Sequence, residues 1–304
     1  IKTEKATIHY HDIGDYLDRE QKLKIVKDFK TFDNPKLDLK TFLPNEHGDW
    51  LSMRNSAFDD FISIEPEKKF NVKSQSIFII NVVGIATGRD SWVYNFSKKT
   101  LSDNMERMIL FFNEQSEDFI QSRKKNAELK VDDFIDTNAG KISWTVNLKK
   151  DIEKGKLHLF STDELNVGFY RPFTKHHLYF DRPFIERPGL WMQLFPTKSS
   201  NNIVIGISSE GSDKGLGVII SNQFGDYHLA GDTKFFPLYY YEENNSAEKS
   251  LFDTDEVNKY IRRDAISNFI FDRAKQQYGK SVTKEDIFYY VYGFLHSKEY
   301  RETF

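Results

Sequence analysis

Apolar side chains recur at helical spacing in several parts of the chain. The clearest stretch runs from Ser102 to about Arg123, where apolar residues three and four positions apart would form one buried helix face. Another helix is predicted from Asp18 to about Phe29, because Asp18 and Gln21 form a capping-box pattern. The apolar face of the longer helix would consist of Met105, Met108, Ile109, Phe112, Phe119 and Ile120.

The C-terminal part of the chain is also predicted to be helical. A further helix begins at Thr283, with Asp286 as its capping partner, and ends before Ser297. Shorter helices are predicted near residues 131–136 and 146–153. One long amphipathic helix is predicted from the spacing of Val257, Ile261, Ala265, Phe269 and Tyr278.

Short runs of apolar and β-branched residues predict strands. One run lies at residues 6–10, and a buried one lies at 76–83. Ser209 to Gly215 is typical of a hairpin tip, and 242–250 of an exposed connector. Strand-like runs between turns cover residues 167–171, 177–180, 203–208, 216–221 and 235–241. We therefore predict an α+β fold, a mixed domain with a central antiparallel β section (about 165–241) flanked by helices and followed by a helical segment (257–304).

Composition narrows the class of protein. The chain has 304 residues, of which 39% are hydrophobic, which is enough for one large domain or two modest ones. No apolar run is long enough to span a membrane, and the first residues lack the apolar stretch of a signal peptide. The absence of cysteine excludes disulfides, thiolate metal sites and cysteine nucleophiles. We expect a cytoplasmic protein with no membrane partner.

Charge is unevenly distributed along the chain. The formal net charge is -3, which argues mildly against a nucleic-acid-binding protein. Residues 171–198, however, contain more cations than carboxylates, and residues 242–256 show the opposite balance. A chain polarised in this way can present a basic surface while it remains acidic overall, although ordinary scatter of surface charge would give a similar pattern.

Several motifs that carry chemistry are missing. DNA amino-methyltransferases need a glycine-rich turn for S-adenosylmethionine and an Asp/Asn-Pro-Pro-aromatic loop, and neither occurs here. A phosphate loop of the Gly-x4-Gly-Lys-Ser/Thr type is also missing, and the glycines at 211, 215 and 217 fit a hairpin better. We therefore expect no catalytic residues, no bound cofactor and no metal in this chain.

One alternative is a magnesium-dependent nuclease. Asp60 precedes Glu67-Lys68-Lys69, and short carboxylates followed by a lysine are the groups that such chemistry uses. The same residues also fit a solvated loop in a charged sequence, which we favour.

Two weaker metal-site patterns also have structural explanations. His9 and His11 alternate along a short predicted strand, and His228 lies between Asp226 and Asp232. Paired histidines on a strand and a polar turn between strands are more often structural. We favour the structural interpretation of both patterns.

Two segments combine cations, amides and aromatic rings. Residues 84–96 follow the predicted buried strand and include Arg89, Trp92, Tyr94 and Asn95. Arginine can bridge guanine, asparagine can pair with adenine, and aromatic rings can stack on bases. Residues 170–189 interleave basic and aromatic residues between prolines, which suits a rigid platform for phosphates and bases. A structural turn and an aromatic core strand, respectively, are equally good interpretations of these segments.

Segments spread over nearly the whole chain resemble one known family. They are similar, in the expected order, to the C-terminal part of the single-polypeptide type I restriction–modification enzymes, which join a nuclease, an ATPase, an N6-adenine DNA methyltransferase and a target-recognition domain. The matching segments are Ile8 to Leu17 with Arg19-Glu20, Pro44 to Trp50, Thr87 to Phe96, Tyr170 to Phe173 with Leu178 to Asp181, Phe236 to Tyr239, and Asp286 to His296 with Glu299-Tyr300-Arg301.

The resemblance implies a division of labour within a longer bacterial polypeptide. Residues 1–40 would be the tail of the methyltransferase domain or its junction, and residues 41–304 would be the target-recognition domain. S-adenosylmethionine, ATP and Mg are implied for the full-length enzyme and not for this chain. The implied partners are double-stranded DNA and the methyltransferase domain of the same polypeptide. A domain that docks other parts of the enzyme through its C-terminal helices is the remaining alternative.

We accordingly predict a sequence-specific DNA recognition module. Phosphate contacts would come from residues 171–198 and from 123–130, and base contacts from the loop at 89–95 and the hairpin at 209–215. Arg89, Asn95, Arg171 and Arg182 would meet on one concave surface. The predicted DNA-binding residues are Arg89, Trp92, Tyr94, Asn95, Arg171, Lys175, His176, Arg182, Arg187, Lys198 and Lys214.

Overall fold

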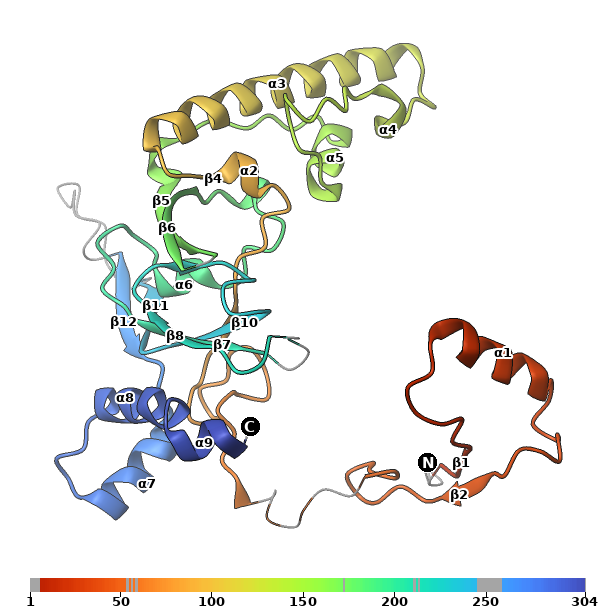
Figure 1. The fold of residues 1–304 in the computed structure, drawn as a ribbon. Helices are drawn as coiled ribbons and strands as arrows, with labels where there is room; N and C mark the ends of the chain where they lie inside the picture. Colours follow the sequence, from red (N-terminus) through yellow and green to blue (C-terminus); the bar gives the residue numbers. More distant parts are fainter. Residues whose placement is uncertain are drawn as a thin grey trace. The chain divides into compact units, whose positions relative to one another are not determined.

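The computed structural model describes residues 6–52, 55, 57, 60–171, 173–209, 212, 214–244 and 259–303 (Figure 1). The chain divides into two compact units, Ile1–Phe61 and Ile62–Phe304. No helix in the described ranges is long and apolar enough to cross a membrane.

The first unit contains a two-stranded antiparallel sheet and one helix. Strand β1 (Ile8–Tyr10) pairs with β2 (Lys40–Phe42). The predicted capping box of α1 (Arg19–Phe29) is confirmed, since the Asp18 carboxylate accepts from the Gln21 backbone N–H at 2.8 Å. None of the residues of α1 is buried, so this unit has little apolar core of its own.

The second unit contains two four-stranded sheets and one hairpin. The sheet β3-β10-β7-β8, here the β7–β10 sheet, is antiparallel throughout. The sheet β4-β6-β5-β9, here the β5–β6 sheet, is antiparallel except for the pairing of β5 with β9. Strands β11 and β12 form the hairpin. The strands are β3 (Val82–Val83), β4 (Tyr94–Asn95), β5 (Leu165–Tyr170), β6 (Thr174–Tyr179), β7 (Val204–Ser208), β8 (Val218–Ser221), β9 (Phe224–Gly225), β10 (Thr233–Pro237), β11 (Tyr239–Glu243) and β12 (Tyr260–Asp264).

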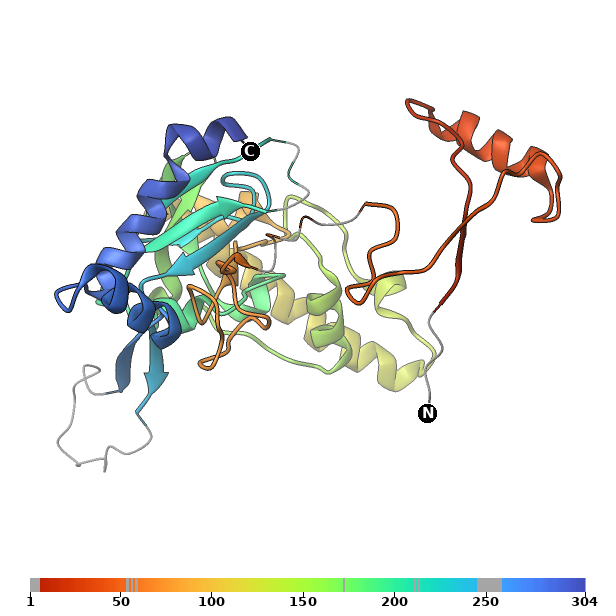
Figure 2. The same ribbon diagram turned by 90° about the horizontal axis from the view of Figure 1, so that it is seen from below.

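Helices lie against both sheets, and the mixed α+β class is confirmed (Figures 1 and 2). The longest, α3 (Lys98–Lys125), begins after Ser97, whose hydroxyl accepts from the Thr100 backbone N–H at 3.2 Å. The other helical segments are α2 (Asp90–Val93), α4 (Val131–Phe134), α5 (Val146–Glu153), η2 (Thr162–Glu164), η3 (Arg182–Phe184), α6 (Trp191–Leu194), α7 (Asn268–Tyr278), α8 (Lys284–Leu295) and α9 (Lys298–Thr303).

Two apolar clusters form the core of the second unit. The larger joins the buried face of α3 to the β5–β6 sheet and includes Phe112, Leu178 and Trp191. The smaller packs α8 against the β7–β10 sheet through Phe288 and Phe236. Burying these aromatic rings contributes about 1.5–3 kcal/mol each, which fixes the sheets and helices as one body.

The predicted helix from 257 is wrong over residues 260–264, which form β12. Ile261 and Ala265 have helical spacing, but the segment pairs with β11 instead. Cross-strand contacts stabilise this pairing, because the Arg262 guanidinium lies 4.3 Å from the centre of the Tyr239 ring and Arg263 donates to Glu242 at 3.1 Å. Residues 245–258, including Val257 and part of the predicted connector, lie outside the described residues.

The predicted strand at 76–83 is buried but mostly irregular. Only Val82 and Val83 belong to a ladder, while Phe78 and Ile80 form isolated bridges to Ile266 and Phe70. The predicted hairpin at 209–215 does connect the antiparallel strands β7 and β8. Residues 210, 211 and 213 of its tip lie outside the described residues.

Candidate nucleic-acid interface

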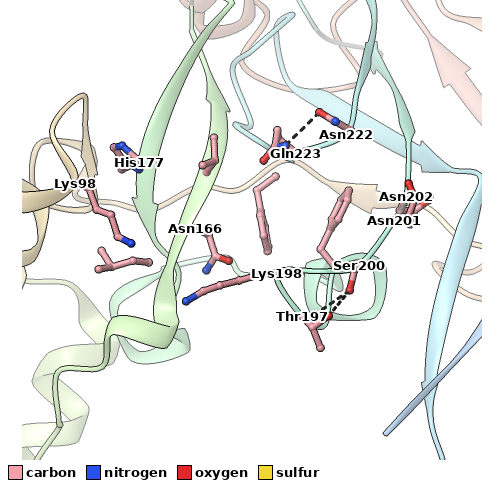
Figure 3. Close-up of a pocket in the computed structure, with 14 residues that line it drawn as sticks. Lys98, Asn166, His177, Thr197, Lys198, Ser200, Asn201, Asn202, Asn222 and Gln223 are labelled. Atoms are coloured by element: carbon pink, nitrogen blue, oxygen red, sulfur yellow. Dashed lines mark hydrogen bonds between the residues drawn. The ribbon is translucent and has the colours of Figure 1, made fainter. Parts of the chain in front are cut away.

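A groove of about 480 Å³ opens beside the β5–β6 sheet (Figure 3). It lies entirely in the second unit, where the start of α3, strands β5 and β6, the α6–β7 loop and the β8–β9 turn meet. The lining residues are Lys98, Leu165, Asn166, Val167, His177, Phe195, Thr197, Lys198, Ser200, Asn201, Asn202, Asn222, Gln223 and Phe224.

The groove is positively charged in an acidic chain. Two lysines line it, and none of its described lining residues is Asp or Glu. The Lys98 and Lys198 side chains point toward one another (Figure 3). Lys198 donates to the Thr162 carbonyl at 3.1 Å, and Asp163, at 3.8 Å, is too exposed to neutralise it strongly. The lysine ammonium groups therefore remain available to an anion.

Amide side chains form the polar part of the same groove. Asn222 and Gln223 contact each other at 3.2 Å, and both belong to the tight β8–β9 turn. Asn201 is exposed on the α6–β7 loop. Asn202, unlike Asn201, is buried. Its side-chain amide forms hydrogen bonds with the backbone of Leu194, Ile203 and Tyr239, and these bonds fix the α6–β7 loop. Asn201, Asn222 and Gln223 can thus offer donors and acceptors to a base edge.

Strand register places two predicted residues on the same sheet face as the groove. His177 lines the groove, and Asn95 lies directly opposite it across the β4–β6 pairing. Lys175 is exposed and lies two residues before His177 on β6, so both side chains leave the same face. From the predicted set, the structure therefore brings Lys198, Lys175 and Asn95 to this side of the sheet.

Arg89 is buried, and its predicted role in base reading is wrong. The residue is 3% exposed, and one guanidinium nitrogen donates to the Thr145 hydroxyl at 2.8 Å. Burial lowers the Arg89 pKa to about 10, while the Glu186 carboxylate opposes this shift. The Arg89 side chain is enclosed by the protein and cannot reach a duplex. The predicted concave surface that included Arg89 is therefore not formed.

Trp92 and Tyr94 belong to the core, so their predicted stacking on bases is also wrong. Both rings are buried, and the Arg107 guanidinium lies 5.9 Å from the centre of the Trp92 ring. The Tyr94 ring packs 4.5 Å from that of Tyr170. Burial raises the Tyr94 pKa well above its usual value. The structural-turn interpretation of residues 84–96 is the one that the burial supports.

Arg171 is held by internal partners. Its guanidinium bonds the Asp90 carboxylate, lies 3.8 Å from Asp226 and covers the Tyr170 ring. Burial raises the Asp226 pKa to about 6, although Arg171 opposes this shift. These contacts fix the β5–β6 hairpin to residues 84–95, so the predicted phosphate contact of Arg171 is not supported.

The remaining predicted residues lie elsewhere in the second unit. His176 is half-buried, its ring lies 3.9 Å from that of Phe96, and burial lowers its pKa. Arg182, Arg187 and Lys214 are exposed but do not line the groove. Their contacts with DNA stay predictions.

Comparison with known proteins identifies the family. Residues 76–304 match the model of the Type ISP C-terminal specificity domain. The chain belongs to this family. No curated protein matches the sequence.

Three solved structures resemble this specificity domain. A nuclease-deletion mutant of the Type ISP restriction–modification enzyme LlaGI, in complex with a DNA substrate mimic, is 32% identical with a TM-score of 0.65 over 99% of this chain and 25% of that one. The ATP-dependent Type ISP enzyme LlaBIII bound to DNA is 31% identical, with a TM-score of 0.68 over 97% and 18%. The DrdV–DNA complex shares the fold at 24% identity, with a TM-score of 0.71 over 98% and 27%. The chain thus spans about a quarter or less of each relative.

Neither the magnesium-dependent nuclease nor the two metal-site patterns are supported by the described residues of this specificity domain or of the preceding unit. No group of three or more His, Asp or Glu residues there could hold a metal ion. Neither Asp60 nor Glu67 lies on a strand. His9 and His11 contact Thr41 and the Asp38 carbonyl, while His228 lies 3.4 Å from Asp232. Docking through the C-terminal helices stays a prediction.

Sequence reasoning missed several groove residues of the specificity domain. Lys98 was hidden because the predicted helix began four residues too late, at Ser102 instead of Lys98. Asn201, Asn222 and Gln223 lie in short polar runs next to strands, at 200–202 in the α6–β7 loop and at 221–223 where β8 ends and the β8–β9 turn begins. Polar runs in strand connections are the signal that could have found them.

Proposed function

We propose that this chain is the sequence-specific DNA recognition module of a bacterial restriction–modification enzyme. The observation that supports this most is the groove at the β5–β6 sheet, where two lysines and several amides meet without any carboxylate in the described lining. Cations attract the phosphate backbone regardless of sequence, and amides discriminate between base edges. The groove therefore combines both requirements of a DNA-reading surface.

Each group would have a distinct role. The Lys98 and Lys198 ammonium groups would contact phosphates and set the register of the duplex. Asn222 and Gln223 would face the major groove, where an amide can pair with both N6 and N7 of adenine. The buried clamp of Asn202 would hold the α6–β7 loop in place during binding.

The larger enzyme is proposed from the family and from its relatives, which are restriction–modification enzymes. We propose that other domains of the same polypeptide carry out N6-adenine methylation and restriction, in the manner of type I enzymes. S-adenosylmethionine, ATP and Mg would bind there, and this chain would carry no catalytic step. Residues 1–40 would join the recognition module to the methyltransferase domain, which would be its partner. The enzyme would act in the cytoplasm. Positioning DNA for that domain would allow the target adenine to be flipped out of the duplex.

Binding of duplex DNA as a function of salt concentration tests the role of the lysines. We expect Lys98→Ala and Lys198→Ala each to weaken binding of every duplex alike and to lower the log–log salt slope by about one. Fluorescence anisotropy of a labelled duplex measures both quantities. Lys280→Ala, which removes an exposed lysine from the α7–α8 loop, is the matched control and should leave both unchanged. Equal salt slopes for all four proteins would rule out phosphate contacts in the groove.

A further inference from the structure

Helix α3 connects the groove to a second basic surface. It contains 28 residues and is therefore about 42 Å long. Its first residue, Lys98, lines the groove, and its last, Lys125, lies at the opposite end. Figure 1 shows α3 as a long rod with α4 and α5 beside its far half.

The far half of α3 is packed firmly enough to hold a fixed position. The Ser116 hydroxyl donates to the Lys156 carbonyl at 2.9 Å, and Asn113 exchanges two hydrogen bonds with the His158 backbone. Phe119 of α3 and Ile152 of α5 are fully buried in the same cluster. The end of α3 and the end of α5 are therefore parts of one rigid body.

Cations gather where these two helices end. Residues 123–130 and 149–156 contain eight Lys or Arg and three Asp or Glu, whereas the whole chain has 43 and 46. Arg123 donates to the Glu153 carbonyl at 3.4 Å, which joins the two segments in space. Lys149 and Lys156 pair with Asp132 and Asp151. We call the six other exposed cations the arm tip: Arg123, Lys124, Lys125, Lys130, Lys150 and Lys154.

Helix dipoles explain only part of this cluster. The helix dipole favours cations near a helix C-terminus, which accounts for Arg123, Lys124 and Lys125 at the end of α3. Lys130 instead precedes the first turn of α4, where the dipole disfavours a cation. None of the six forms an ion pair with a carboxylate in the described residues. The excess charge therefore fits an external polyanion.

We propose that the arm tip binds the phosphate backbone of the same duplex that the groove reads, about 12 base pairs away from it. The inference rests on the proposed function of the groove. With α3 aligned along the duplex axis, as the proposal requires, its length of about 42 Å corresponds to about 12 base pairs at 3.4 Å per step, slightly more than one turn of B-DNA. Because one turn returns the backbone to the same side of the duplex, Lys98 and the arm tip can contact the same face of the DNA.

Duplex trimming tests this inference in the full chain. Two probes are compared. The long duplex has about 40 base pairs and is centred on a sequence that the chain selects from a random pool. The trimmed duplex keeps that sequence and about 5 base pairs on each flank. We expect one triple variant, Lys124→Ala/Lys125→Ala/Lys154→Ala, to bind the long duplex about tenfold more weakly than the wild type does. Its salt slope should be lower by two to three. On the trimmed duplex the variant and the wild type should bind equally.

A control variant removes three exposed cations elsewhere, as Lys73→Ala/Arg273→Ala/Lys280→Ala, and should match the wild type on both duplexes. Thermal unfolding verifies that each variant is folded, as we expect because all of the substituted residues are exposed. The inference is overturned if the arm-tip variant binds the long duplex as tightly as the wild type does. It is also overturned if the variant loses as much affinity for the trimmed duplex as for the long one. Neither result affects the proposed role of the groove. A wild-type chain that enriches no sequence from the random pool overturns the proposed function as well.

Discussion

Lys198 and Arg89 carry the same charge in contrasting surroundings. The Lys198 side chain is 53% exposed and borders the groove, whereas Arg89 is 3% exposed and donates to Thr145. Two further Arg89 nitrogens, Nε and Nη1, have no partner among the described residues. Transferring a charged group out of water is costly, and the lowered pKa of Arg89 reflects that cost. Only Lys198 can exchange its surroundings for a DNA phosphate without unfolding the core.

Replacing Arg89 should therefore leave DNA binding unchanged. We expect Arg89→Met, which keeps the length of the side chain and removes the buried charge, to bind duplex DNA within about twofold of the wild type and with the same salt slope. Anisotropy titrations measure affinity, and thermal unfolding monitors the fold separately. A tenfold loss of affinity at an unchanged unfolding temperature would place Arg89 at the DNA.

At the residue scale, the sequence indicates which side chains can contact DNA but not which are exposed. Trp92 and Tyr94 have the chemistry of a stacking platform, yet both are buried. Nothing in the order of residues 84–96 distinguishes a loop over the core from a loop on the surface. Lys198 was predicted as a DNA contact in a basic segment, and that contact stays a prediction. The place of Lys198 in the groove depends on the α6–β7 loop that Asn202 fixes.

Among the elements, the β5–β6 hairpin is held by an ionic network of which only Asp226 is buried, since the Arg171 and Asp90 side chains are partly exposed. Arg171, at the end of β5, bonds Asp90 of α2 and lies near Asp226, which follows β9. Asp226 accepts from the His228 backbone N–H at 2.9 Å. Three segments that are distant in sequence thus meet at two carboxylates and one guanidinium, on the β5–β6 sheet that also lines the groove.

This network predicts a pH-dependent stability. Burial raises the Asp226 pKa to about 6, while an unfolded aspartate titrates near 4. The stability that protonated Asp226 contributes is therefore full below about pH 4 and lost as the pH rises to about 6. Asp226→Asn removes this titration, so its free energy of unfolding should rise relative to that of the wild type by about 1.4 kcal/mol per pH unit between about pH 4 and 6.

Urea unfolding at several pH values between 4 and 7 measures the difference. Asp163→Asn is the control, because the Asp163 side chain is 92% exposed. A difference between Asp226→Asn and the wild type that does not change with pH would show that Asp226 is not protonated in the folded protein.

Helices with explicit caps could be predicted from the sequence, and strands defined only by distant partners could not. The capping boxes of α1 and α8 mark their starts, and both are confirmed. The residues of β12 follow helical spacing, but pairing with β11 decides their conformation. Local pattern identifies an element when its stabilising contacts are local, and fails when they come from a partner elsewhere in the chain.

At the scale of the whole molecule, every lining residue of the groove belongs to the second unit. They all lie between Lys98 and Phe224, and the match to the specificity-domain family begins at residue 76. A fragment of residues 62–304 should therefore unfold in one cooperative transition and bind duplex DNA within about threefold of the full chain. Calorimetry and anisotropy test the two parts. A fragment that folds but loses DNA affinity more than tenfold would show that residues 1–61 contribute to the interface.

The net charge of -3 is compatible with this account because the cations are localised. Charge acts over about one Debye length, roughly 10 Å at ordinary salt, so a phosphate senses the groove or the arm tip and not the average of the chain.

Selection of duplexes from a random pool tests the central claim most directly, namely that the amides of this groove read DNA sequence. The wild-type chain should enrich a defined sequence. Asn222→Ala and Gln223→Ala should each relax the preference at one or two base pairs, a loss of about 1–3 kcal/mol in discrimination. Enrichment of the same sequence by the wild type and both variants, or of no sequence at all by the wild type, would contradict the account.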